Sequence, residues 1–232
     1  MQVSDVLSRL EANKNDRGMA NWAKMANTGG LSSYGIGLTV LRKLAKQIGR
    51  DRDLALALWE SDIYDAKVIG LLIDDPKQIT IEQAEKQVQE LGKGMLTHVF
   101  SSCDATLAKS PVAIDLAMCW LESDDELRKK SAYGLWYELS KKQHKRLTEA
   151  LFMAQVEKIS DRIDHESKGV RLSMGGALMG IGKRSIALNK AALAVADRVG
   201  PIDFSEDGKK CEPMDFAKHL KSDYIRSKLG LD

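Results

Sequence analysis

The sequence has few of the residues that build disulfide-rich or membrane-spanning proteins. Its 232 residues include three cysteines, four prolines and 6% aromatic residues. Cys103, Cys119 and Cys211 form an odd set without CxxC spacing, which argues against disulfides and against a cysteine zinc site. No apolar run approaches the ~18 residues of a membrane span, and the N-terminus has no apolar signal segment. We therefore expect a cytoplasmic protein with reduced thiols, no metal, no cofactor and no membrane partner.

The chain also carries little net charge. Its 35 basic and 33 acidic residues leave a formal charge of +2, which by itself does not demand a nucleic-acid partner. The basic residues nevertheless form clusters at 42–46, 128–130, 141–146, 168–171 and 183–184. A single cluster is typical of a solvated face, but several clusters on one surface would form a phosphate-binding track.

What the sequence does contain is helix-forming residues at helical spacing. Ala, Leu, Lys and Glu are abundant, and no window alternates with period two for long, so the pattern predicts an all-α protein of about a dozen helices. Helix starts are expected at Ser4, at Thr80 with Gln83 three places on, at Ser110-Pro111 and at Ser123. The least regular segments are 28–37 and 200–213, and we expect the second to be a loop before a C-terminal helix.

An internal repeat indicates how these helices are arranged. The segment DLALALWESD (53–62) matches DLAMCWLESD (115–124), and each copy precedes a second helix with a patch of small residues. A helix with one apolar stripe cannot bury it alone, so repeated helical pairs stack side by side. The repeat predicts one α-solenoid domain over residues 1–232 and, we expect, a monomer.

The segment VRLSMGGALMGIGKRS (170–185) looks like a phosphate loop but does not fit one. A Walker loop requires GxxxxGK followed by Ser or Thr, whereas Lys183 precedes Arg184 and the glycine spacing differs. Its apolar residues recur at helical spacing instead. Three glycines inside a helix (175, 176 and 180) indicate close approach, by a neighbouring helix in the first instance and by a ligand in the second.

No catalytic constellation stands out from the residues themselves. The sequence around His98 predicts that this histidine is buried, and no second histidine or carboxylate stands at metal-ligand spacing from it. No serine–histidine–aspartate arrangement is recognisable. A lone histidine in such a context is typical of a structural role.

Three segments resemble one known family. Residues 34–80 contain LRKLAK, LALALW, YDAK and DDP elements, residues 119–133 read CWLESDDELRKKSAY, and the glycine helix follows at 170–185. Together they resemble the AlkD-like DNA alkylation repair family, within the HEAT-like repeat alkylpurine DNA glycosylase superfamily, of which this chain resembles a divergent member. The resemblance implies tandem HEAT-like antiparallel helical repeats with a basic concave face for duplex DNA. It also implies hydrolytic release of cationic N3- or N7-alkylpurines, in which a carboxylate stabilises an oxocarbenium-like sugar.

The chain departs from that family where the chemistry is expected. The family's Trp-Asp-x-x-Asp motif falls on Gly94-Met95-Leu96-Thr97-His98, so the tryptophan and both acids are replaced. Its arginine falls on Lys130, which keeps the charge but loses the bidentate fork. Its late tryptophan falls on Gly176. A histidine in place of the carboxylate would not stabilise a cationic sugar.

These observations favour a DNA-binding HEAT-like repeat protein without the usual glycosylase residues, and hence without an assignable catalytic residue. Two alternatives stay open, an alkylpurine glycosylase with a non-standard site and a protein-interaction scaffold without a DNA role. Whether the chain is an enzyme is left open by the sequence. The residues expected to contact DNA, including damaged or branched DNA, are Arg42, Lys67, His98, Lys130, Arg171, Lys183 and Arg184.

Overall fold

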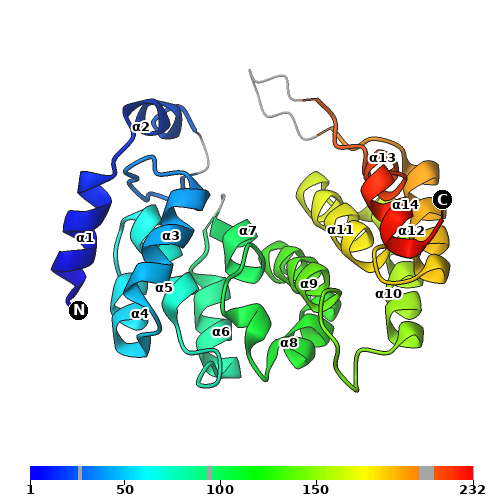
Figure 1. Cartoon of the computed structure of the whole chain (residues 1–232), viewed down its shortest axis with the longest axis horizontal. Helices are drawn as coiled ribbons and strands as arrows, with labels where there is room; N and C mark the ends of the chain where they lie inside the picture. Colours follow the sequence, from blue (N-terminus) through cyan, green and yellow to red (C-terminus); the bar gives the residue numbers. More distant parts are fainter. Residues whose placement is uncertain (26–27, 93–95, 204–211, 232) are drawn as a thin grey trace. The chain divides into compact units, whose positions relative to one another are not determined.

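The computed structural model describes residues 1–25, 28–92, 96–203 and 212–231. Within these residues the chain is all-helical, with two isolated backbone bridges and no extended strand (Figure 1). The predicted all-α class is confirmed. The chain divides into two compact units, Met1–Leu116 and Ala117–Asp232. The expectation of a single domain over residues 1–232 concerns how these units join, and it stays a prediction.

The first unit is built around helix α5. Its α-helices are α1 (Val3–Ala12), α2 (Asp16–Trp22), α3 (Leu38–Ile48), α4 (Arg52–Trp59), α5 (Tyr64–Ile73), α6 (Ile81–Gln89) and α7 (Leu96–Ser101), and helix α8 (Ala113–Cys119) crosses the boundary between the units. Every residue of α5 is buried, and α3 and α4 pack against it. A Cβ at Gly70 would lie 2.8 Å from the carbonyl oxygen of Ala55, so glycine is what allows α4 and α5 to approach this closely.

A buried carboxylate fixes the irregular segment before α3. Asp65 of α5 accepts hydrogen bonds from the Ser33 hydroxyl at 2.7 Å and from the backbone N–H groups of Tyr34 and Ile36 at 2.8 and 3.1 Å. Its side chain is fully buried, so these bonds replace its lost hydration. The described part of the predicted irregular segment, residues 28–37, is indeed non-helical.

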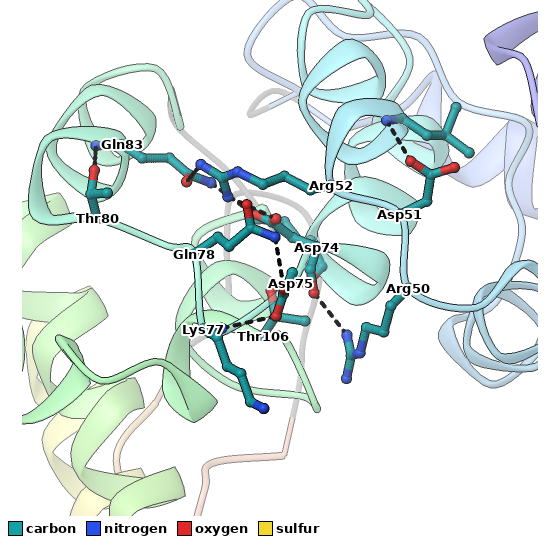
Figure 2. A network of polar contacts seen from close by, with 12 residues as sticks. Arg50, Asp51, Arg52, Asp74, Asp75, Lys77, Gln78, Thr80, Gln83 and Thr106 are labelled. Atoms are coloured by element: carbon teal, nitrogen blue, oxygen red, sulfur yellow. Dashed lines mark hydrogen bonds and ion pairs between the residues drawn. The ribbon is translucent and has the colours of Figure 1, made fainter.

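A polar network joins the ends of three helices in the same unit (Figure 2). Arg52 at the start of α4 forms an ion pair with Asp74 at 3.1 Å, and Asp74 also accepts a bond from Gln83 of α6 at 2.7 Å. Arg50 donates to the backbone carbonyls of Leu72 and Asp74, at the C-terminal end of α5. A cation at this end of a helix compensates its dipole and its unpaired carbonyls.

The second unit consists of two layers of longer helices. These are α9 (Glu126–Leu139), α10 (Glu149–Arg162), α11 (Lys168–Ile181) and α12 (Ile186–Val199), followed by the short helices α13 (Phe216–Leu220) and α14 (Asp223–Leu229). Helix α9 packs along α11, and α10 packs against α12. A Cβ at Gly169 would contact Lys130 near the start of α9, whereas one at Gly180 would contact Tyr137 near its end, so α9 and α11 run in the same direction. Alternate helices that run parallel in one layer are what stacked antiparallel helical pairs produce.

Of the three glycines at 175, 176 and 180 in α11, two pack closely against other residues and one faces open space. A Cβ at Gly175 would overlap the ring of Phe216, and one at Gly180 would lie 2.6 Å from Ser140 Oγ. At Gly176 an added Cβ would meet nothing within 4 Å. Close helix packing, the first of the two interpretations of this stretch, is therefore confirmed for Gly175 and Gly180, and Gly176 is the exception.

The predicted helix boundaries are partly confirmed. Both copies of the internal repeat form a helical segment before α5 or α9, and Thr80 caps α6 by accepting from the Gln83 N–H. Three expected starts are wrong: α1 is capped at Gln2 rather than Ser4, α9 at Asp125 rather than Ser123, and α8 begins at Ala113, after a turn at Ser110-Pro111. Short polar side chains also favour turns and first-turn positions, and here Ser4 lies inside α1 whereas Ser110 and Ser123 lie in the non-helical residues before α8 and α9. Two short helices, instead of one, follow the predicted 200–213 loop, of which residues 204–211 lie outside the described part.

Candidate nucleic-acid interface

In the second unit, Lys130 and Gly176 lie on the two helices that pack side by side, α9 and α11. The Nζ atom of Lys130 lies 3.4 Å from the position of a Cβ at Gly169, and its side chain is half-buried. Gly176 is seven residues further along α11, on the same helical stripe as Gly169. Glu126 Oε1 lies nearer to the same Cβ position, at 2.9 Å, so the stripe combines a lysine and an acid with a position that has no side chain and faces open space.

Three lysines gather near the C-terminal end of this helix pair. Burial lowers the pKa of Lys183, and the neighbouring charges of Lys141 and Lys228 lower it further. Lys141 forms an ion pair with Glu138 at 2.9 Å and lies 4.2 Å from the centre of the Tyr137 ring. Because like charges raise each other's energy, this lysine cluster of Lys141, Lys183 and Lys228 favours an anion beside it.

The sequence from α9 to α12 carries an excess of basic residues. Between residues 126 and 199 the sequence has fifteen Lys and Arg residues against eight Asp and Glu residues. Some of the cations are used internally, such as Lys129, which bonds both oxygens of Glu166 at 2.9 Å. The excess positive charge is nevertheless concentrated on α9 to α12, whereas the whole chain has a formal charge of only +2.

The two predicted arginines of the second unit differ in their environments. Arg184 donates to the backbone carbonyls of Ser140 and Lys142 and lies 4.3 Å from the centre of the Phe152 ring, so it closes the C-terminal end of α9. The guanidinium Nε of Arg171 is buried and makes no hydrogen bond to any described residue. Arg184 is therefore held by its own fold, whereas Arg171 has a donor without a partner in the described part of the chain.

In the first unit, Arg42 lines a depression with a volume of about 430 Å³. Its Nε forms an ion pair with Asp104 at 3.1 Å, and three further cations line the depression, namely Lys46, Arg50 and Lys109. Asp104 is the acidic residue in this lining. Arg50 and Lys109 already donate to backbone carbonyls, so within the described residues Lys46 is the cation of this lining best placed to bind an anion. The sequence pattern drew attention to the cluster at 42–46 but not to Arg50 and Lys109, which reach it from separate segments.

The structure places Lys67 inside the first unit. Its side chain is 9% exposed, its Nζ donates to the carbonyl of Trp59, and the same atom lies 4.5 Å from the centre of the Trp59 ring. Burial lowers the pKa of Lys67, against the charges of Glu90 and Glu60. We therefore correct its interpretation as a phosphate-contacting residue, because its ammonium already closes the C-terminal end of α4.

His98 is exposed rather than buried, contrary to expectation. It lies on α7, and its Nε2 is 3.0 Å from Sγ of Cys103. Of the five positions matched to the Trp-Asp-x-x-Asp motif, Leu96 and Thr97 are buried, and Gly94 and Met95 lie outside the described residues. The described residues hold no cluster of three or more metal-ligating side chains.

The fold of this chain matches that of a solved protein. A solved structure covers 99% of this chain and 97% of its own, with a TM-score of 0.84 and 23% identity. It is described as one of a new family of proteins related to the HEAT-like repeat DNA glycosylases, with affinity for branched DNA structures. The predicted α-solenoid of HEAT-like helical repeats is thereby confirmed as the fold of this chain.

The chain belongs to the DNA alkylation repair enzyme family, whose model matches residues 3–205. It is 26% identical over 200 residues to the uncharacterized protein Lmo0209 of Listeria monocytogenes, covering 85% of this chain and 86% of that protein. It is 25% identical over 193 residues to the uncharacterized protein Lin0241 of Listeria innocua, with 82% and 83% covered. Within the described residues, no helix has the length and apolar character needed to cross a membrane.

Proposed function

We propose that this protein binds DNA through its phosphates and lacks the alkylpurine glycosylase chemistry of its family. The observation that carries the proposal is the stripe of α11 that joins Lys130 to the open position at Gly176, with the neighbouring charges of Lys141, Lys183 and Lys228, which lie after α9, after α11 and on α14. A duplex carries closely spaced negative charges, and a protein that neutralises them releases bound counterions. Lys130 and Arg171 extend the same set of cations along the two helices.

The cationic depression around Arg42 supports a second phosphate contact in the first unit. It places Lys46, Arg50 and Lys109 near one another, and Lys46 has no ion pair with any described residue. Contacts of this kind position a protein on nucleic acid without reading its sequence. Because the structural relative has affinity for branched DNA, junctions belong among the substrates to be tested.

The loss of glycosylase chemistry rests on the matched motif positions. A hydrolytic glycosylase needs a negative group beside the developing oxocarbenium ion, and here the second acid position holds His98, which lies against a thiol instead. The tryptophan positions hold Gly94 and Gly176. An imidazole cannot supply the negative charge that the transition state requires.

Fluorescence anisotropy with duplex, nicked and four-way junction DNA tests the proposal when each titration is repeated over a range of salt concentrations. Binding should weaken linearly on a log–log scale, with a slope of about −0.9 for each phosphate neutralised. Lys183→Gln should reduce the magnitude of this slope by about one unit. Lys190→Gln, which removes an exposed lysine of α12, is the matched control and should leave the slope unchanged. Absence of binding at low salt, or equal effects of the two variants, would refute the proposal.

A further inference from the structure

Cys103 lies in a strained turn against a histidine. The turn follows α7, and both Cys103 and Asp104 have left-handed backbone conformations, with φ of 56° and 73°. The turn brings Sγ of Cys103 to 3.0 Å from Nε2 of His98, five residues earlier. Non-glycine residues adopt this conformation at a cost, and strained backbone of this kind is concentrated at functional sites.

The groups around this thiol favour its ionised form. Burial alone raises the pKa of Cys103, but hydrogen bonds from His98 and Ser102 and the charges of His98 and Arg42 outweigh it, and the pKa is lowered. Ser102 Oγ lies 3.7 Å from Sγ, and Arg42 donates from Nε to the Cys103 carbonyl at 3.3 Å.

Groups that oppose the thiolate also face this turn. Asp104 is adjacent but forms an ion pair with Arg42, and Lys109 donates to the Asp104 carbonyl at 2.9 Å. Tyr64 of α5 stays neutral, because burial first and then the charges of Asp65 and Cys103 raise its pKa to about 12. Among the described residues, the thiol therefore faces the His98 imidazole, the Arg42 guanidinium, the neutral Tyr64 phenol and the Asp104 carboxylate, which is paired with Arg42.

We propose that Cys103 is a nucleophilic thiolate that accepts alkyl groups from carbon electrophiles. The sulfur lone pair forms a bond to the electrophilic carbon, the bond from that carbon to its leaving group breaks, and the leaving group departs with the electron pair. The thiolate becomes a neutral thioether and His98 keeps its proton, so the step needs neither an oxidant nor a partner thiol. Each molecule reacts once. This inference does not depend on DNA binding.

Competition between two cysteines of the same chain tests the reactivity. The full-length protein is treated with limiting iodoacetamide at pH 6 to 9, and labelling of Cys103 and Cys119 is followed by peptide mass. Cys119 is exposed and serves as an internal reference. Although Cys103 is only half-exposed, it should react several-fold faster than Cys119 at pH 7, because more of it is thiolate. Equal or slower labelling of Cys103 would overturn the proposal.

The His98→Gln variant tests the cause of that reactivity. Glutamine keeps hydrogen-bonding capacity but carries no charge, so the pH–rate profile of Cys103 should move to higher pH while that of Cys119 stays in place. His165→Gln, at an exposed histidine of the second unit, is the matched control and should leave both profiles unchanged. An unchanged Cys103 profile in His98→Gln would overturn the proposal, and an unchanged thermal unfolding transition by circular dichroism shows that the variant is folded. Treatment with methyl methanesulfonate should then place a single methyl group on Cys103.

Discussion

Replacing Gly176 by alanine should stabilise the protein, whereas the same change one residue earlier should destabilise it. Both glycines lie inside α11, where alanine is favoured by about 0.5–1 kcal/mol because it loses less backbone entropy on folding. At Gly176 nothing lies within 4 Å of the new Cβ, so this gain is realised in full. At Gly175 the Cβ would overlap the Phe216 ring, and the resulting overpacking costs about 1–3 kcal/mol.

Thermal unfolding followed by circular dichroism measures the difference. For a chain of 232 residues we expect Gly176→Ala to raise Tm by about 1–4 °C and Gly175→Ala to lower it by several degrees. Gly180→Ala should also lower Tm, since its Cβ would lie 2.6 Å from Ser140 Oγ and 2.9 Å from the Tyr137 ring. A lower Tm for Gly176→Ala, or equal effects at all three positions, would refute the conclusion that Gly176 faces open space.

Three further predictions follow from buried and paired charges. Asp65→Ala should cost about 2–4 kcal/mol of unfolding free energy in a urea titration, because it leaves three donors of the segment before α3 without an acceptor; a loss below 1 kcal/mol would contradict that role. Lys67→Met should destabilise the protein in the same assay but leave the salt slope of DNA binding unchanged, and a reduced slope would return Lys67 to the interface. Glu122 accepts hydrogen bonds from Lys158 and Arg162 at 2.8 and 3.0 Å, and these bonds lower the pKa of its carboxyl group. The two pairs therefore stabilise the fold above the ordinary glutamate pKa. This stabilisation is lost as the pH falls through the lowered pKa. The deficit of Glu122→Gln, at most about 1 kcal/mol for so exposed a group, should therefore shrink between pH 7 and pH 3, and a deficit that grows on acidification would contradict the assignment.

The helical class and the repeats could be predicted because they depend on periodic burial, which the sequence displays directly. The cap at Thr80 could be predicted from Gln83 three places on, and the close packing at Gly175 and Gly180 from glycines inside a helical pattern. Caps at Ser4 and Ser123 were wrong because neighbouring polar residues competed for the same backbone donors, and the choice between them depends on how the chain enters the helix. Such short-range alternatives differ by too little energy for a pattern to decide.

The candidate site was predicted less well, since the partner of a cation is set by tertiary packing. Lys67 and Arg184 are residue types that often bind phosphate. Here each donates instead to a backbone carbonyl at the C-terminal end of a helix. Arg50 and Lys109 join Arg42 only because separate segments meet at one depression. The pairing of His98 with Cys103 requires a left-handed turn at Cys103 and Asp104. This turn contains no glycine or asparagine, the residues from which such a turn is usually predicted.

The central claim is that the fold and its cations bind DNA while the family's hydrolytic chemistry is missing, and release of methylated purines tests it most directly. Methylated duplex DNA is incubated with enough protein to be fully bound, as anisotropy verifies, and free bases are quantified by chromatography against a no-protein control. We predict release of 3-methyladenine and 7-methylguanine at the spontaneous rate. Release above that rate by the wild type, abolished in a His98→Gln or Lys130→Gln variant that still folds, would contradict the account.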